Sequence, residues 1–429
     1  MKRIVALASV LLLGLGACGG GDDSDDGTAG GGGEGTGTIT FLTFETPNLT
    51  PEYWEEAIGR VTDEHPEIDV DRLVSPTDDR TEYARQLLTS GQFPDVLIAV
   101  SPAGFAEAGN LYAWTEEELE DFLFPTNGAV GGEVYQLPAN TQTIPVVYYN
   151  KTMFEQAGIT EVPATYDDLL AVAEQLEAAG IKPFVAGGQH DSIGPLWAGI
   201  LGTEVYAKNP DWMHDRRAGD VSFCDAEFKA GAAKLAELAS QGYIDPADVS
   251  RDHAAVQEAF LAGDGAMYPM GNWFAAGVDT AEEPPGFEIG QFFWPSDDGS
   301  MVVPAFTGGG LLVNADSEHL EAARTFALGF QLDPENLDNS ARFDGLFPAI
   351  EGWEPPSDVG PTYQEGFDLY QEGLEADAIV PAFGFEAGDD AMLPGVVESW
   401  DASAVDLITG NKTVDEVCQF LDSEWEAAS

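Results

Sequence analysis

Positive charge is scarce in this sequence. Its 429 residues contain 17 Lys and Arg against 76 Asp and Glu, which gives a formal net charge of −59. A surface this negative repels nucleic acid and anionic membrane surfaces, so we expect neither as a partner. Hydrophobic residues still make up 44% of the chain, which is enough apolar material for folded cores and argues against global disorder.

Cysteine and catalytic signatures are scarce too. The three cysteines, Cys18, Cys224 and Cys418, exclude a disulfide-dense scaffold. The sequence lacks HExxH, P-loop, GxSxG and CxxC motifs, and its five histidines lack metal-ligand spacing. His190, Asp191 and Ser192 adjoin one another, but sequence neighbours do not form a catalytic triad, and we expect a polar loop there. We therefore expect no enzyme activity, no metal and no cofactor.

Residues 4–15 form an apolar run that is too short to span a bilayer. The run follows two positive charges and ends in Leu-Gly-Ala-Cys at Cys18, which resembles the lipobox of bacterial lipoproteins. We therefore predict a signal peptide over residues 1–17 and lipidation of Cys18. The alternative is an ordinary signal peptide that contains a cysteine by chance.

Residues 18–37 are rich in glycine and aspartate and contain no large apolar side chain. Such a segment predicts a flexible tether, which would hold a folded body at the outer face of the cell membrane through the lipid alone. The acidity of the whole chain predicts self-repulsion that high ionic strength would screen. We infer a saline external habitat, the alternative being an acidic secreted protein from an ordinary one.

Strand and helix patterns alternate along the rest of the chain. Alternating or continuously apolar runs predict strands at 38–44, 68–74, 94–100, 132–138, 144–150, 182–186, 266–270 and 306–314. Helical spacing and capping signals predict helices at 51–64, 82–88, 166–179, 227–241, 253–262, 318–332, 361–376, 396–409 and 414–426. This pattern indicates an α/β fold with mainly parallel sheets. The length favours two domains, and because no linker separates them, we expect the chain to cross between them more than once.

Several phrases occur in the order and spacing of a known family. They are SGQFPDV (90–96), FAEAGNLYAW (105–114), VYQLPANTQTIPVVYYNKTMFEQAGI (134–159), FKAGAAKLAELASQGYIDP (228–246), AFLAGDGAMYPMGNW (259–273), FTGGGLLVN (306–314), GLFPA (345–349) and SWDASAVDLITGNKTVDEV (399–417). In these phrases the chain resembles the family 1 extracellular solute-binding proteins of ABC importers, the maltose-binding-protein-like group of sugar-binding lipoproteins.

The resemblance implies a two-lobe periplasmic-binding-protein-like fold with a ligand cleft between the lobes. One lobe would comprise residues 38–142 plus 304–346, and the other 143–303 plus 347–429. The implied function is capture of a mono- or oligosaccharide and its delivery to the transmembrane subunits of an ABC permease, by a protein that we expect to be a monomer. The alternatives are a non-sugar solute (a polyol, glycerol phosphate, amino acid or peptide) or a secreted carbohydrate-active enzyme.

Two tryptophans are candidates for contact with a sugar ring. Trp273 follows a predicted strand and a glycine turn, and the family's tryptophan in this phrase is often a stacking residue. An indole at a strand end can cover the apolar face of a sugar. Packing in the core or between lobes is the alternative for Trp273. Trp197 is a second candidate for an aromatic wall of the ligand site. The alternative for Trp197 is packing in the core.

Open α/β sheets bind ligands at strand ends, so polar residues and glycines at those ends are candidate ligand contacts. The candidates are Glu45, Ser101, Asn140, Gln142, Gly309 and Asp344. Asn140 and Gln142 lie at a presumed crossover, where family members commonly contact ligand. Gly309 lies at a second crossover, where bare backbone permits close approach. For Glu45 the alternative role is that of a helix cap.

Cys224 and Cys418 remain after the lipid cysteine. The family places both segments in the C-terminal lobe, and outside the membrane a cysteine pair more often bridges than stays free. The resemblance therefore implies a Cys224–Cys418 disulfide that fastens the last helix to that lobe.

Overall fold

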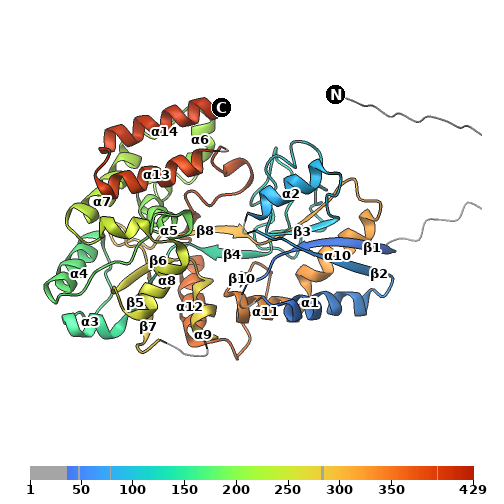
Figure 1. Cartoon of the computed structure of the whole chain (residues 1–429), viewed down its shortest axis with the longest axis horizontal. Coiled ribbons are helices and arrows are strands. Elements are labelled where there is room, and N and C mark those ends of the chain that lie inside the picture. Colours follow the sequence, from blue (N-terminus) through green and yellow to red (C-terminus); the bar gives the residue numbers. More distant parts are fainter. Residues whose placement is uncertain (1–35, 47–48, 78, 282–284, 394) are drawn as a thin grey trace, which may run out of the picture. The chain divides into compact units, whose positions relative to one another are not determined.

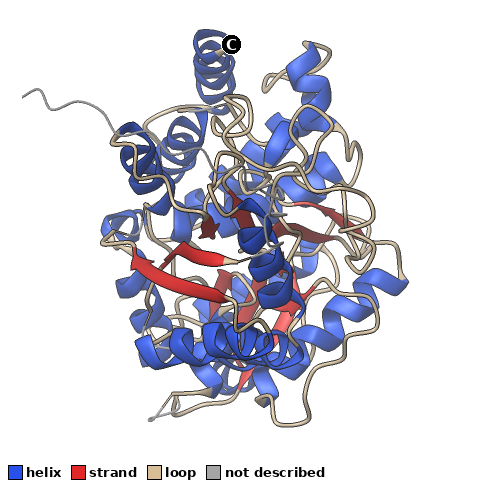
Figure 2. Ribbon diagram, turned by 90° about the vertical axis from the view of Figure 1, so that its right-hand side faces the viewer, coloured by secondary structure: helices blue, strands red, loops and turns tan. Residues whose placement is uncertain are grey.

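The computed structural model describes residues 36–429 except 47–48, 78, 282–284 and 394. The predicted signal peptide, the predicted lipidation site at Cys18 and almost all of the predicted tether lie outside the described residues. Within them, three sheets are flanked by helices (Figure 1, Figure 2). In this part of the chain, no helix combines the length and the apolarity needed to cross a membrane.

The first sheet has the strand order β2-β1-β3-β9 and carries helices on both faces. Its elements are β1 (Gly37–Thr43), β2 (Ile68–Val74), β3 (Val96–Ile98), β9 (Leu311–Val313), and the helices α1 (Pro51–Glu64), α2 (Arg80–Thr89) and α10 (Leu320–Leu332). β1 is parallel to β2 and β3, whereas β9 is antiparallel to β3. Ile39 and Phe41 of β1 pack in the core with α1 and α10, and Leu42 packs in the core with α2. The strand is thus buried on both faces, as a doubly wound sheet requires.

Local sequence signals explain why α1 begins at Pro51 and which of its faces is buried. The Thr50 side chain accepts a hydrogen bond from the Tyr53 backbone N–H, and proline occupies the first turn. Trp54, Ala57 and Val61 are buried at helical spacing. They press α1 against β1, which holds the end of that strand in place for the site described below.

The second sheet has the order β6-β5-β7, with β5 (Val146–Asn150) between β6 (Met267–Met270) and β7 (Ile289–Phe293). β5 is antiparallel to both neighbours, so the prediction of a mainly parallel sheet is wrong here. A single parallel bridge between Phe184 and Met267 is all that remains of the strand predicted at 182–186. The strands that return after long helical connections run opposite to β5, because β5 enters this sheet directly from the neighbouring one.

Helices cover both faces of the second sheet and make two cores. Val147 packs in one core and Val146 and Tyr148 in the other, as alternation along a strand requires. The remaining helices are α3 (Lys151–Ala157), α4 (Tyr166–Ala178), α5 (His190–Leu201), η1 (Gly202–Tyr206), α6 (Trp212–Ala218), α7 (Ala226–Ser240), η2 (Pro246–Ser250), α8 (His253–Ala262), α9 (Phe274–Asp279), α11 (Pro334–Asp344), α12 (Pro361–Glu375), η3 (Gly388–Asp390), α13 (Val396–Thr409) and α14 (Val414–Ala428).

A third sheet, here called the linking sheet, has the order β10-β4-β8-β11. Its strands are β10 (Phe347–Pro348), β4 (Asn140–Thr143), β8 (Val303–Gly308) and β11 (Ile379–Pro381). β4 leads directly into β5 of the second sheet, and β8 leads directly into β9 of the first. In Figure 1, β4 and β8 lie between the elements around β1 and those around β5. The chain therefore crosses between the two other sheets at these strands.

The linking sheet has two distinct faces. Gln142 pairs with Phe306 and Thr141 with Thr307, and paired side chains of antiparallel strands point to the same face. Asn140 lies on the face of Gln142, two residues along β4. We call the face with Asn140, Gln142 and Phe306 the cavity face, and the face with Thr141 and Thr307 the rear face. Tyr370 of α12 hydrogen-bonds to Thr141, so α12 covers the rear face.

The last helix is fastened beside α7 and α13. Cys224 and Cys418 form a disulfide, the pairing implied by the resemblance. Asp422 of α14 accepts hydrogen bonds from the Ser222 hydroxyl at 2.6 Å and the Phe223 backbone N–H at 3.0 Å. It also pairs with the Arg216 guanidinium at 2.9 Å. Cys418 and Asp422 are four residues apart, so the covalent and polar contacts hold the same face of the helix.

Some expected elements differ from those in the structure. Residues 132–138 make isolated bridges only, because no neighbouring strand runs alongside them far enough to form a ladder. The polar loop expected at His190 is the first turn of α5, an almost wholly buried helix that contains Pro195. α6, α9 and α11 are additional helices that the sequence patterns did not predict.

Candidate functional site

Three of the predicted ligand contacts line one cavity of about 60 Å³. They are Asn140 at the start of β4, Gly309 just after β8 and Asp344 at the end of α11. Phe44, which follows β1, lines the same cavity. Residues far apart in the sequence therefore meet where the first sheet adjoins the linking sheet.

Asn140 is held in place on the cavity face. Its side-chain oxygen accepts a hydrogen bond from the Gln142 amide at 3.0 Å. Gly309 has φ of +66°, and a Cβ there would lie 2.9 Å from the Asn140 amide nitrogen. Only glycine meets both conditions without strain. Gln142 is thus beside Asn140 on the same face, although it does not line the cavity.

An aromatic ring and a guanidinium stand at the end of β1. The Arg80 guanidinium lies 4.4 Å from the centroid of the Phe44 ring, and its Nε donates to the Ala99 carbonyl at 3.0 Å. Ala99, which follows β3, has φ of +54°, an uncommon conformation for a residue with a Cβ. These contacts turn the backbone at the end of β3 toward the cavity, which Ala99 also lines.

Asp344 is the acidic group of the cavity. Burial raises the pKa of its carboxyl from 3.8 to about 7, and the positive charge of Arg80 opposes part of that rise. Among the described residues, the Asp344 carboxyl has no hydrogen-bond partner. A polar group that is partly buried without a partner is ready to bind a hydroxyl group.

Trp273 lies immediately behind Asp344 but does not line the cavity. A Cβ on Gly345 would lie 2.9 Å from the Cα of Trp273. The Asn272 side chain fastens this turn, because it accepts from the Thr143 N–H at 3.1 Å and donates to the Gly345 carbonyl at 2.7 Å. Trp273 itself is partly buried and packs against the core of the second sheet.

Glu45 and Ser101 stand outside the cavity. The Glu45 carboxylate pairs with the Arg72 guanidinium at 2.7 Å, so it is engaged in an ion pair at an exposed position. Ser101 is exposed, and its hydroxyl accepts a 3.4 Å hydrogen bond from the Ala103 N–H in a local turn. The cavity is lined instead by Phe44 and Ala99, which precede them on the same loops.

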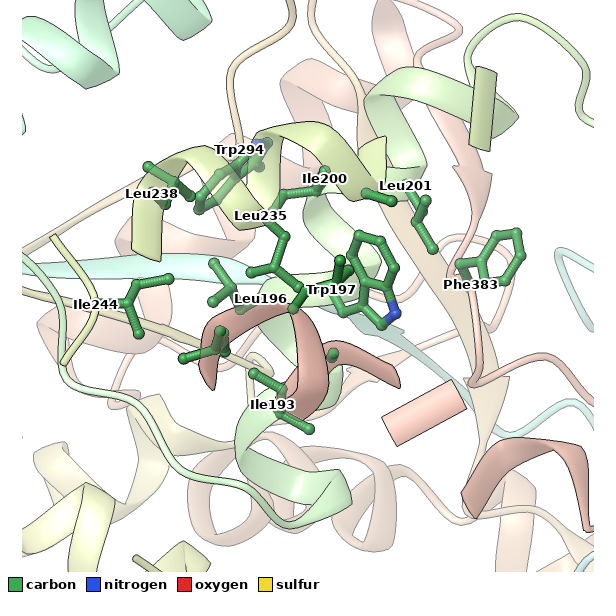
Figure 3. Close-up of a cluster of buried hydrophobic side chains, with 14 of the residues drawn as sticks. Ile193, Leu196, Trp197, Ile200, Leu201, Leu235, Leu238, Ile244, Trp294 and Phe383 are labelled. Carbon is green, nitrogen blue, oxygen red and sulfur yellow. The ribbon is translucent and has the colours of Figure 1, made fainter. Parts of the chain in front are cut away.

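Trp197 is fully buried in the core of the second sheet. Figure 3 shows it among Leu196, Ile200 and Phe383 in a cluster of buried hydrophobic side chains. Its ring stacks on Trp400 with centroids 6.2 Å apart. This position corresponds to the core role, the alternative considered for Trp197, and we do not retain it as a ligand contact.

Three aromatic rings near the cavity face were not predicted as site residues from the sequence. Phe306 of β8 stacks on Phe385, and the Phe385 ring contacts His190 at the start of α5 in a tilted arrangement. Alternation along β8 could have placed Phe306 on the face of Gly308, but Phe385 follows no regular pattern. His190 hydrogen-bonds to Asp401 at 3.0 Å. Burial alone would lower the pKa of His190, but the bond and charge of Asp401 outweigh burial and raise it.

A larger cavity, of about 580 Å³, is lined by Phe306 of the cavity face as well as by Thr307 of the rear face. Segment 123–128, Thr307 and the end of α12 are among its walls. None of the predicted site residues lines it. We place the candidate site on the cavity face, because the predicted polar residues converge there.

Comparison with known proteins identifies the family to which the chain belongs. A family model described as "Bacterial extracellular solute-binding protein" matches residues 46–335, more than half of the chain. A "Probable sugar-binding periplasmic protein" of Mesorhizobium japonicum is 27% identical over 175 residues, which are 40% of this chain and 40% of that protein. A "Multiple sugar-binding protein" of Streptococcus mutans is 25% identical over 276 residues, which are 61% of this chain and 64% of that protein. The chain thus spans less than two thirds of the length of both relatives.

A solved structure extends the likeness to almost the whole fold. A "Chitin oligosaccharide binding protein" superposes with a TM-score of 0.76 at 20% identity and covers 92% of this chain and 99% of that one. At this identity the likeness concerns the fold, and it confirms the predicted α/β fold class. Taken with the match to the family model, it leads to one conclusion: the chain belongs to the family of bacterial extracellular solute-binding proteins.

Proposed function

We propose that this protein is the substrate-binding component of an ABC importer and that its ligand is a carbohydrate. The observation that carries the proposal is the convergence of Asn140, Asp344 and Phe44 on one cavity. The amide and the carboxyl can hydrogen-bond to hydroxyl groups, and the ring can cover an apolar sugar face. The names of the two relatives and of the solved structure, all of which refer to sugars, support this ligand class.

Capture would involve movement of two lobes about β4 and β8. We assign residues 38–142 plus 304–346 to one lobe and 143–303 plus 347–429 to the other. The cavity of about 60 Å³ is smaller than the about 300–1,000 Å³ of typical ligand pockets, and all of its lining residues belong to the first of these lobes, so a sugar held there would extend toward the second lobe. Ligand contacts with both lobes would then favour the closed form.

Trp273 and Gln142 would extend the site beyond the cavity. Trp273 belongs to one proposed lobe and Asp344 to the other, and they meet through Gly345. A ligand hydrogen-bonded to Asp344 could therefore be covered by the Trp273 ring as the lobes close. Glu45 and Ser101 would lie at the outer rim, where opening of the Arg72 ion pair would release the Glu45 carboxylate.

The protein would do no chemistry on the sugar. It would act as a monomer at the outer face of the cell membrane, anchored through a lipid on Cys18 alone, and deliver its ligand to the transmembrane permease subunits. Lobe closure would create the surface that those subunits recognise.

A thermal-shift screen tests the proposal on the purified protein. The panel contains mono- and oligosaccharides, polyols, glycerol 3-phosphate, amino acids and peptides, each at low and at molar salt. A ligand at 100 times its Kd adds about 2.7 kcal/mol of stability, which is easily measured. We expect a saccharide to stabilise the protein. If another class of solute does so and no saccharide does, the carbohydrate proposal is wrong.

Two variants assign the site. Trp273→Ala should weaken saccharide binding at least about tenfold, because it removes the aromatic contact. Trp353→Ala is the matched control, because Trp353 is also a partly buried tryptophan against the same core but donates to Asp338 instead of lying beside Gly345 and Asp344. Equal losses of affinity in the two variants would show a general effect on folding and not a ligand contact.

A further inference from the structure

Two loops that belong to different cores meet at the wall of the larger cavity. The first loop comprises residues 128–131, and its Val130 packs in a core of the first sheet. The second loop comprises residues 387–391, and Met392, which follows it, packs in a core of the second sheet. Both loops contribute residues to the wall of the larger cavity. This meeting point is separate from the chain crossings at β4 and β8, so it is an additional connection between the two cores.

Asp389 makes two hydrogen bonds from the second loop to the first. Its backbone N–H donates to the Ala129 carbonyl at 2.8 Å. Its carboxylate accepts from the Gly131 backbone N–H at 2.7 Å, and a hydrogen bond to a charged group is about twice as strong as one between neutral groups. Asp389 is exposed and lines neither cavity, so these bonds are made outside the candidate ligand site.

Glycines allow the two loops to meet backbone against backbone. Gly388 has φ of +66°, and a Cβ there would overlap the Ala129 carbonyl oxygen. Gly131 has φ of +61° in a tight turn whose flanking residues, Val130 and Glu133, exchange both backbone hydrogen bonds. Glycine adopts such positive φ values without strain, whereas most other residues do not. A side chain at position 388 would therefore hold the loops apart.

The second loop is fastened to elements around the second sheet. The Arg217 guanidinium of α6 donates to the Ala391 carbonyl at the end of the loop. The Tyr206 hydroxyl of η1 donates to the Glu386 carboxyl, just before the loop. The second loop should therefore move with α6 and η1 whenever the proposed lobes move relative to each other.

We propose that residues 128–131 and 387–391 form a clasp between the lobes, and that Asp389 is a positioning residue that strengthens ligand binding without touching the ligand. The inference rests on the proposed function, since it assumes that the lobes open and close around a ligand. The clasp is made of protein atoms alone, so it stabilises the closed form before a ligand enters as well as afterwards. A ligand that requires the closed form then binds with an apparent affinity that rises with the fraction of protein already closed.

Small-angle X-ray scattering of the ligand-free full chain is the first test. Asp389→Ala removes the carboxylate, and Gly388→Ala keeps it but introduces a Cβ that overlaps the first loop. Both variants should have a larger radius of gyration than the unaltered protein, because the lobes separate more often. Asp389→Asn keeps an oxygen that can accept from the Gly131 N–H, so it should restore part of the closed population.

Asp298→Ala is the matched control. Asp298 is also exposed, and its carboxylate likewise accepts a backbone N–H, that of Ser300 at 3.0 Å. Both residues belong to one lobe, so the variant removes the same charge and the same kind of hydrogen bond without affecting contacts between the lobes. Its radius of gyration should equal that of the unaltered protein.

Titration calorimetry and stopped-flow dissociation give the second test. The probes are glucose, maltotriose, xylotriose and the β-1,4-linked trimer of N-acetylglucosamine, and the variants are measured with the probe that the unaltered protein binds best. Asp389→Ala and Gly388→Ala should weaken binding about tenfold, mainly through faster dissociation. Asp298→Ala should leave the affinity unchanged.

The outcomes separate the clasp from the function on which it rests. If Asp389→Ala and Gly388→Ala match the control in radius of gyration, the clasp is wrong, whatever their affinity, because any loss of affinity would then arise at the ligand site itself. If their radius of gyration increases and their affinity is unchanged, Asp389 is not a positioning residue for binding. If the radius increases as expected and none of the probes binds to the unaltered protein, the clasp stands and the carbohydrate proposal is contradicted.

Discussion

Removal of the Cys224–Cys418 disulfide should destabilise the protein by a predictable amount. The two residues are 194 positions apart, so the bond closes a very long loop in the unfolded chain. The loop-entropy relation gives about 5 kcal/mol for a loop of this length, whereas natural disulfides usually contribute about 2–4 kcal/mol. We therefore expect the double variant Cys224→Ala/Cys418→Ala to lose about 2–5 kcal/mol of unfolding free energy.

The structure also predicts what the double variant should retain. Asp422 still accepts hydrogen bonds from Ser222 and Phe223 and still pairs with Arg216. The last helix should therefore remain docked in the folded protein, because the disulfide acts mainly on the unfolded state. Circular dichroism should be unchanged, and adding Asp422→Asn should loosen the helix further.

Denaturant unfolding followed by tryptophan fluorescence measures the effect. The unaltered protein is compared with the double variant, and peptide mapping after alkylation counts free thiols at 224 and 418. If the two unfolding free energies agree to within about 0.5 kcal/mol, the loop-entropy reasoning is refuted. If both thiols are free in the unaltered protein, the pairing itself is refuted.

Three further predictions concern the core, the acidic group of the cavity and the net charge. Trp197→Ala should cost about 3–5 kcal/mol of unfolding free energy, measured by denaturant unfolding, because it empties a fully buried site. The pKa of Asp344, raised from 3.8 to about 7, means that the folded form keeps a proton the unfolded chain has lost, so its contribution to stability falls as pH rises from about 4 to 7. The stability of Asp344→Asn relative to the unaltered protein should therefore increase across that window in ligand-free samples, and a constant difference would contradict the assignment. A net charge of −59 predicts that the thermal midpoint rises between about 0.01 and 1 M salt, as the screening length falls from about 30 to 3 Å, and a flat profile would contradict the inferred adaptation to salt.

The sequence predicted those elements whose signals are local. The helices 51–64 and 166–179 were predicted almost to the residue, because a capping threonine precedes each and buried residues recur at helical spacing. α11 carried comparable signals, with Pro334 in its first turn and Gly345 just past its end, but its polar surface hid the period. α5 was missed for the opposite reason. It is buried on every side, so it has no polar face to reveal a helix.

The site was predicted only in part, because proximity is a tertiary property. Asn140, Gly309 and Asp344 were each predicted as ligand contacts from their own place in the sequence. Only the fold brings them to one cavity. Residue type could not tell Trp197 from a ligand-stacking tryptophan, although its unbroken apolar surroundings indicated a core. Phe385 had no sequence signal, since its role arises from stacking on Phe306 after β11.

The most direct test of the central claim compares adjacent residues on opposite faces of β4. Titration calorimetry would use the saccharide that binds best to the unaltered protein. Asn140→Ala removes the amide on the cavity face, and Thr141→Ala makes a matched change on the rear face. The account predicts that Asn140→Ala weakens binding at least about tenfold, while Thr141→Ala leaves the affinity unchanged. A loss confined to Thr141→Ala would place the ligand on the rear face and contradict the account.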